Sequence, residues 1–107
     1  RHPIFIGDRI DTDIVGAGNV RMDSLFVFTG AHGKYDLADA DPIGRPTHIG
    51  YDVSALLAPA REAEIIGNGF RPDDIEGQLD LLWCVLHAIW RFNAEGADLL
   101  ARLDLLR

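Results

Sequence analysis

Two short apolar runs near the start of the chain are separated by a polar loop and a stretch of small residues. Residues 4–7 (IFIG) are too few for a helix and end at a glycine, so they predict a short buried strand. Residues 24–28 (SLFVF) are aromatic and β-branched and predict a second strand. Between them a weak helix is expected to begin near Ile14, capped by Thr12 or Asp13. Strand, helix and strand form a βαβ unit, which implies parallel strands.

The rest of the chain is predicted to be a long loop followed by helices. Residues 31–51 are rich in Gly, Pro, His and Asp and are expected to be that loop. A helix is expected from about 53 to 63, and residues 67–72 (GNGFRP) read as a turn. Helical periodicity then runs from about 74 to 92, and a last helix is expected from 98 to the end.

Length, charge and cysteine content narrow the class of protein. The 107 residues, 48% of them hydrophobic, suit a single small globular domain over 1–107. The formal net charge of −7 disfavours nucleic acid or an anionic membrane surface as a partner. The only cysteine, Cys84, excludes an internal disulfide, and its apolar surroundings predict a buried, unreactive thiol. We therefore expect a cytoplasmic protein.

Three carboxylates follow the first predicted strand within six positions: Asp8, Asp11 and Asp13. Open parallel sheets place their functional loops at the carboxyl ends of the strands, and Asp8 comes directly after such an end. A carboxylate there is a natural ligand for Mg²⁺, which takes one or two carboxylates together with phosphate oxygens. The alternative is that all three are solvated loop and cap residues.

The segment FIGDRIDTDIVGAGNVRMDSLFVFTG, residues 5–30, resembles the fourth-motif region of haloacid dehalogenase (HAD)-like phosphatases. The closest resemblance is to subfamily IIA, which contains 4-nitrophenylphosphatase, pyridoxal phosphate phosphatase and nucleotide monophosphatases. Order and spacing agree over about residues 3–32, in the features Gly7-Asp8, Thr12-Asp13-Ile14, Gly16-Ala17, Met22 and Thr29-Gly30. One departure is Arg21, which stands where the family usually has the glycine that ends this helix.

The resemblance implies an α/β fold: a partial Rossmannoid (HAD-like) core with a short parallel sheet and flanking helices. Within it, Asp8 would hold Mg²⁺, and Asp13 would brace the loop or bind a metal-bound water. Arg9, Thr29 and His32 would line the site. Residues 1–32 would form the matched motif region of a single partial domain, and 33–107 its loop and helices.

The resemblance also implies chemistry that this chain cannot complete. The family hydrolyses phosphomonoesters through an aspartyl-phosphate formed on an Asp-x-Asp motif, and that motif precedes the fourth. Here only three residues precede the fourth-motif strand. The single lysine, Lys34, follows the second strand and is interpreted as a surface residue rather than the family's phosphate-binding lysine. We therefore expect a Mg²⁺-dependent phosphatase acting on a phosphorylated small molecule only as part of a complete enzyme, with this chain inactive alone.

Two alternative functions remain open, and the sequence also predicts that the chain associates with another chain. The segment GDRIDTDI, residues 7–14, is also similar to the opening of the swivel domain of small-subunit isopropylmalate dehydratases. The apolar run LLWCVLHAIW, residues 81–90, would suit a non-catalytic interaction or assembly module, with His87 as a core or interface histidine. We expect the chain to self-associate, or to need a missing N-terminal half, through the 4–7 edge and a Trp83–Trp90 surface.

Overall fold

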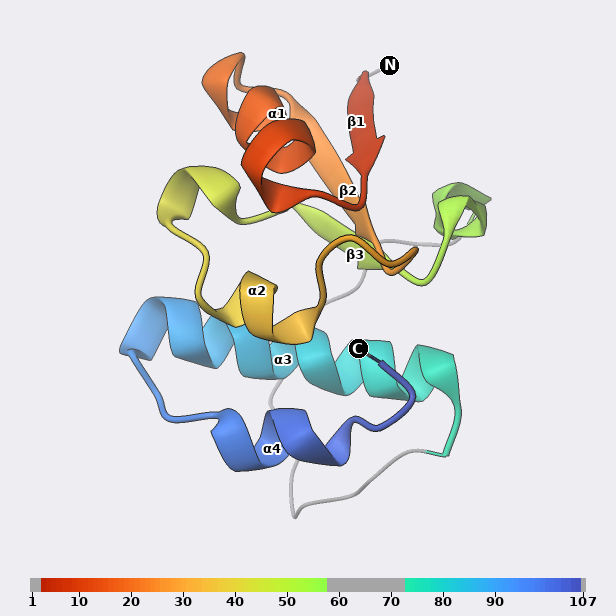
Figure 1. Ribbon diagram of the computed structural model, residues 1–107, viewed down its shortest axis with the longest axis vertical. Helices are drawn as coiled ribbons and strands as arrows, with labels where there is room; N and C mark the ends of the chain where they lie inside the picture. The colour runs from red at the N-terminus through yellow and green to blue at the C-terminus, as the bar shows by residue number, and fades with distance from the viewer. Residues whose placement is uncertain (1–2, 58–72, 107) are drawn as a thin grey trace.

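One parallel sheet organises the N-terminal half of the molecule. The computed structural model describes residues 3–57 and 73–106. Within them, β1 (Ile4–Gly7), β2 (Asp23–Val27) and β3 (His48–Gly50) pair in the order β1-β2-β3. Both pairs are parallel, with Ile4 opposite Asp23 and Leu25 opposite His48. The predicted α/β class and the two predicted parallel strands are confirmed, and β2 is the central, buried strand (Figure 1).

The helical segment between β1 and β2 begins earlier than predicted. A π-helical turn, η1 (Ile10–Ile14), runs straight into α1 (Val15–Asn19). The amides of Asp13 and Ile14 both donate to the Arg9 carbonyl, at 3.1 and 3.2 Å. The predicted cap at Thr12 or Asp13 is wrong, because both residues lie inside this turn. The extra residue in the turn places Ile14 in the core and turns Asp13 back towards β1.

The turn that ends α1 forms despite the arginine at its left-handed position. Arg21 has a φ of 57°. Its amide donates to Gly18 O at 3.1 Å, and the Met22 amide donates to Ala17 O at 2.9 Å. These two bonds are those of a Schellman motif, which usually carries glycine at this position. The departure at Arg21 therefore changes the residue but not the turn.

The predicted long loop over 31–51 is wrong. It contains α2 (Lys34–Ala38), a 3₁₀ turn η2 (Pro42–Gly44) and β3. The Asp36 side chain accepts from the Gly33 amide at 2.7 Å at the start of α2. β3 is only three residues long and is defined by its pairing with β2, which the local sequence does not reveal.

Two helices complete the described chain. The predicted long helix is confirmed as α3 (Ile75–Phe92), with Asp74 as its N-cap accepting from the Gly77 amide at 2.6 Å. The last helix, α4 (Ala97–Arg102), ends before the C-terminus, so the prediction that it continues to the end is wrong. Residues Val53–Leu57 form a 3₁₀ helix, η3. The expected continuation to 63 and the turn at 67–72 lie outside the described residues.

The main core lies between the sheet and the helices. Figure 1 shows α2 between the sheet and α3, with α4 running along α3. The α3 side chains in this core are Leu79, Leu82, Trp83, Val85 and Leu86, and they pack with residues of α2, β2, β3 and the C-terminal segment. No helix in 3–57 or 73–106 is both long and apolar enough to cross a membrane.

The burial of the α3 aromatic residues corrects part of the predicted association surface. Trp83 is only 5% exposed, and the partly buried Trp90 donates its Nε1–H to Leu37 O at 3.0 Å. His87 packs between both indoles and lies 2.9 Å from Trp83 O through Nδ1. A Trp83–Trp90 surface is therefore wrong, because the chain's own α2 covers it. The predicted burial of Cys84 is also wrong, since this residue is only half-buried.

Candidate functional site

Asp8 lies where the loops after two neighbouring strands meet. β1 ends at Gly7, which is opposite Phe26 in β2, so the segments that follow the two strands emerge side by side. The Thr29 hydroxyl donates to Asp8 Oδ2 at 2.7 Å. The His32 amide donates to the Asp8 carbonyl at 3.1 Å. Asp8 is thus held from the β2 side through both its side chain and its main chain.

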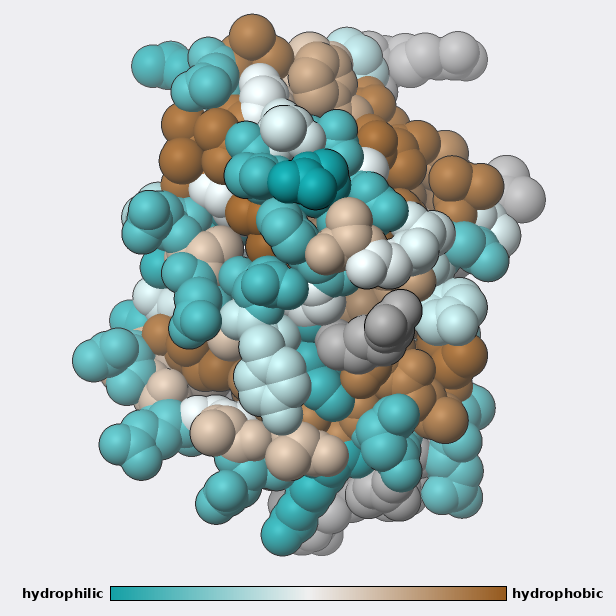
Figure 2. Space-filling view, viewed as in Figure 1, coloured by the Kyte–Doolittle hydropathy of each residue, from teal (hydrophilic) through white to brown (hydrophobic). Residues whose placement is uncertain are grey.

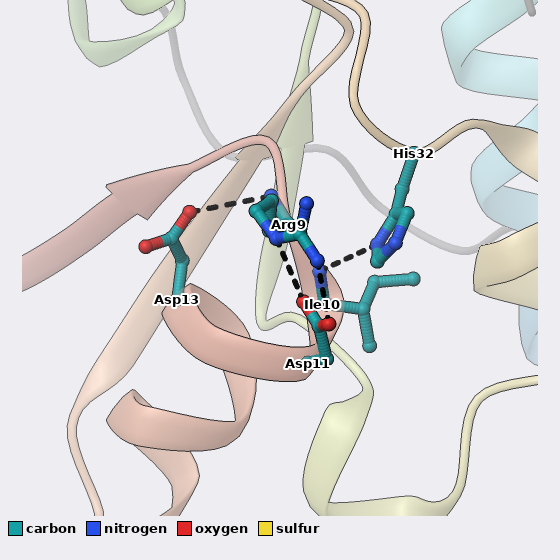
Figure 3. Close-up of polar contacts among 5 residues, drawn as sticks. All are labelled: Arg9, Ile10, Asp11, Asp13 and His32. Carbon is teal, nitrogen blue, oxygen red and sulfur yellow. Dashed lines mark hydrogen bonds and ion pairs between the residues drawn. The ribbon is translucent and has the colours of Figure 1, made fainter.

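Asp13 packs against the end of β1. Its Oδ2 accepts from the Arg9 amide at 3.2 Å (Figure 3). The carboxylate occupies the space that a Cβ on Gly7 would fill. Gly7 is therefore required here for the close approach of Asp13, rather than for an unusual backbone angle. The contact joins the end of β1 to η1 and fixes the polypeptide on either side of Asp8.

Arg9 and Asp11 form a two-point ion pair on the outside of the loop. Arg9 Nε donates to Asp11 Oδ1 at 3.0 Å, and Arg9 Nη2 donates to Asp11 Oδ2 at 2.7 Å. The hydrogen bond from Arg9 lowers the pKa of Asp11, and the same contact raises the pKa of Arg9. Both side chains are about half exposed, so Asp11 lies on the solvent side of the loop and the pair adds little stability.

His32 makes a side-chain contact with the same loop, which sequence reasoning did not find. Ile10 donates its amide N–H to His32 Nδ1 at 2.8 Å (Figure 3). The two residues are 22 positions apart, so no local pattern marks the contact. Of the residues predicted to surround Asp8, the structure brings Thr29 and His32 against its loop, while the Arg9 side chain turns to Asp11.

Lys34 is not the surface residue that was predicted. It is 5% exposed, and its Nζ donates to the Leu103 carbonyl at 2.6 Å. Burial lowers the pKa of Lys34, and the nearby Asp104 carboxylate opposes that shift. The side chain therefore connects α2 to the segment after α4 instead of pointing to the strand ends. The prediction that it is not a phosphate-binding lysine is consistent with this position.

The residues present fit part of a Mg²⁺ site. Asp8 offers a half-buried carboxylate oriented by a hydroxyl, which is a suitable oxygen ligand for this cation. Across 3–57 and 73–106, no three His, Cys, Asp or Glu side chains converge as a metal cluster. A cation at Asp8 would therefore take its other ligands from water, substrate or a protein segment beyond the described residues.

A cavity of about 350 Å³ lies at the other end of the sheet. It is lined by residues of η1, α1, η2 and the amino ends of the strands, among them Ser24, Arg45 and Thr47. Ser24 is near the start of β2, whereas Asp8 follows the end of β1. Asp8 is therefore not part of this cavity.

Comparisons with known proteins find relatives of this chain. A family model described as HAD-hydrolase-like matches residues 1–56. The D-glycerol 3-phosphate phosphatase of Mycobacterium tuberculosis is 35% identical, over 92% of this chain and 33% of that protein. Crystal structures of glycerol phosphate phosphatase from the same organism, with magnesium and with calcium, superpose with TM-scores of 0.65 and 0.67 at 35% and 30% identity. They cover 84% of this chain and 31% and 32% of theirs, so the chain spans about a third of their length.

Proposed function

The chain belongs to the HAD-hydrolase-like family, and from that premise we propose that it carries the fourth-motif carboxylate, Asp8, of a Mg²⁺-dependent phosphatase. The observation that carries the proposal is the position of Asp8 at the carboxyl end of β1 with Thr29 on its Oδ2. Family membership sets aside the isopropylmalate dehydratase swivel domain. The assembly-module alternative depended on residues 81–90, and four of these are buried in the chain's own core: Leu82, Trp83, Val85 and Leu86.

The proposed reaction is hydrolysis of a phosphomonoester through an aspartyl-phosphate. When bound, Mg²⁺ supplies positive charge that offsets the phosphate oxygens. In this chain, Thr29 holds one Asp8 oxygen through its hydroxyl, and the contact of Asp13 with the Arg9 amide holds the loop that follows. The nucleophilic Asp-x-Asp would come from another segment, because this chain has none at the end of a strand. Alone it should therefore be inactive.

The proposed substrate is a small phosphorylated molecule. The mycobacterial relative is named for D-glycerol 3-phosphate, which makes glycerol phosphate the first compound to test. A chain with a formal net charge of −7 needs a cation to accept such an anion, which fits the proposed role of Asp8. A single cysteine, unable to form an internal disulfide, suits the cytoplasmic setting proposed for the enzyme.

A chimera tests the proposal. The segment of the mycobacterial phosphatase that aligns with this chain is replaced by this chain, and Mg²⁺-dependent hydrolysis of glycerol phosphate is measured. Asp8→Asn should lower kcat/KM roughly 100-fold or more, because the carboxylate that would hold Mg²⁺ is lost, and with it the cation that offsets the phosphate charge. Asp11→Asn is the matched control and should change little, since Asp11 pairs with Arg9 on the outside of the loop.

Two results would contradict the proposal. Equal losses of kcat/KM in Asp8→Asn and Asp11→Asn would show that Asp8 has no role that Asp11 lacks. Mg²⁺-dependent turnover of 4-nitrophenyl phosphate by the pure chain, lost in Asp11→Asn, would place the nucleophile in this chain instead.

A further inference from the structure

The segment after β2 holds the loop after β1 at three points. Thr29 Oγ1 donates to Asp8 Oδ2 at 2.7 Å, and the His32 amide donates to the Asp8 carbonyl at 3.1 Å. The third contact is from the Ile10 amide to His32 Nδ1 at 2.8 Å. His32 therefore contacts the residues on both sides of Arg9, once through its main chain and once through its ring.

The Ile10 amide has no partner within its own helix. Ile10 is the first residue of η1, and the first amides of a helix lack an intrahelical acceptor. Arg9, at the N-cap position, makes no side-chain cap hydrogen bond. The His32 ring thus caps η1 from 22 residues away. Since Nδ1 accepts, the ring is the neutral tautomer with its proton on Nε2.

We propose that His32 is a positioning residue that fixes the backbone of residues 8–10 and thereby the direction of the Asp8 carboxylate. The inference depends on the proposed function of Asp8 for its catalytic meaning. Two contacts from one residue, to the Asp8 carbonyl and to the Ile10 amide, leave the intervening peptides little rotational freedom. The Thr29 hydroxyl then selects which Asp8 oxygen turns towards β2.

The first measurement needs no variant. In the ¹⁵N-labelled chain, a hydrogen-bond scalar coupling between the Ile10 amide nitrogen and His32 Nδ1 should be detectable by NMR. Its absence, or ring nitrogen shifts of the tautomer protonated on Nδ1, would overturn the proposed contact.

The second measurement compares variants of the same chain by amide hydrogen exchange. His32→Ala keeps the backbone donor to Asp8 but removes the ring. The Ile10 amide should then exchange roughly fivefold faster or more, the change expected for one lost hydrogen bond. His32→Asn should restore protection, because its side-chain oxygen can accept from the Ile10 amide. His48→Ala, a half-buried histidine in β3, is the matched control and should leave this amide unchanged.

The third measurement uses MnCl₂ as the probe, since Mn²⁺ prefers the same oxygen ligands as Mg²⁺. Amides of residues 8, 9 and 29 should broaden selectively in the wild type and not in Asp8→Asn. His32→Ala should need several-fold more Mn²⁺ for the same broadening, and His32→Asn should need about as much as the wild type.

The exchange and broadening results together test the positioning role of His32. Faster exchange and weaker Mn²⁺ broadening in His32→Ala, both restored in His32→Asn, support the positioning role. Unchanged exchange in a folded His32→Ala, or failure of His32→Asn to restore it, overturns that role. Broadening that is absent in the wild type, or persists in Asp8→Asn, counts against Asp8 as the metal ligand. The exchange measurement then still decides whether His32 holds the loop.

Discussion

Arg21 has a left-handed backbone at the position where α1 ends. Its φ of 57° is unusual for a residue with a side chain, and the turn around it keeps both hydrogen bonds of the Schellman motif. Asn93 has a similar φ of 52° at the end of α3. Asn tolerates this region far better than Arg, because its short polar side chain can bond to nearby backbone. The two helix ends therefore differ in strain.

Arg21→Gly is expected to raise the free energy of unfolding by about 0.5–1 kcal/mol. The cost of a left-handed arginine, roughly 1–2 kcal/mol, is removed, and the greater freedom of glycine in the unfolded chain offsets part of the gain. Urea unfolding measures the change. Asn93→Gly is the control and should gain less. An Arg21→Gly variant less stable than the wild type would contradict this account of the turn.

Lys34 should make stability depend on pH in the alkaline range. Burial lowers its folded-state pKa below 10.5, so between these two values the unfolded chain binds more protons than the folded chain. The free energy of unfolding should therefore rise as the pH is raised through this interval. Because Lys34 is the only lysine, its Nζ resonance reports the folded-state pKa directly. Urea unfolding of Lys34→Met should lack this contribution, and an identical pH slope in both proteins would contradict the prediction.

The element that presents Asp8 is the junction between β1 and η1. Here the absence of a side chain at Gly7 lets the Asp13 carboxylate reach the Arg9 amide. Gly16, in α1, has a different environment, because a Cβ there would have Phe5 Cε2 as its nearest neighbour at 4.0 Å. Two glycines nine positions apart thus have opposite tolerance for a methyl group.

Gly7→Ala should destabilise the chain by about 1–3 kcal/mol, the usual effect of forcing an added methyl into a packed contact. It should also displace Asp13 and expose the Arg9 amide to hydrogen exchange. Gly16→Ala should instead stabilise by roughly 0.5–1 kcal/mol, because alanine is the better helix former and the space is open. Urea unfolding of both variants decides the matter, and equal effects would contradict the packing described at Gly7.

At the scale of the molecule, helices cover one end of the sheet while β1 stays at its edge. Among the described strands β1 pairs with β2 alone, and its Phe5 and Ile6 are 39% and 37% exposed. Figure 2 shows a group of apolar side chains over the position of β1, beside the polar middle of this face. An exposed apolar edge strand readily pairs with another strand. The exposure of β1 is thus a physical reason to keep the prediction that the chain associates through the 4–7 edge.

Light scattering at micromolar concentration should show self-association of the isolated chain. Ile6→Lys should reduce it, because a charge on an edge strand discourages pairing. Phe92→Lys is the matched control: Phe92 is 77% exposed at the end of α3, away from the sheet edge, and the change should leave association unaltered. A monodisperse wild-type monomer of 11.8 kDa would contradict this prediction.

The features that depend on neighbours along the chain could be predicted from the sequence. The apolar runs at 4–7 and 24–28 predicted parallel strands, and the helical periodicity from about 74 to 92 predicted α3. The position of Asp8 at a strand end follows from the same local pattern. Each depends on residues within a few positions, where propensity and periodicity act.

The contacts between distant segments could not be predicted from the sequence, because they form only when the chain folds. β3 is a strand because its backbone pairs with that of β2. Lys34 can be buried because its Nζ donates to the carbonyl of Leu103, which is 69 positions away in the sequence. The His32 ring reaches Ile10 for the same reason: parallel strands bring the ends of β1 and β2 together. These contacts link residues that are far apart in the chain, so no local window contains both partners.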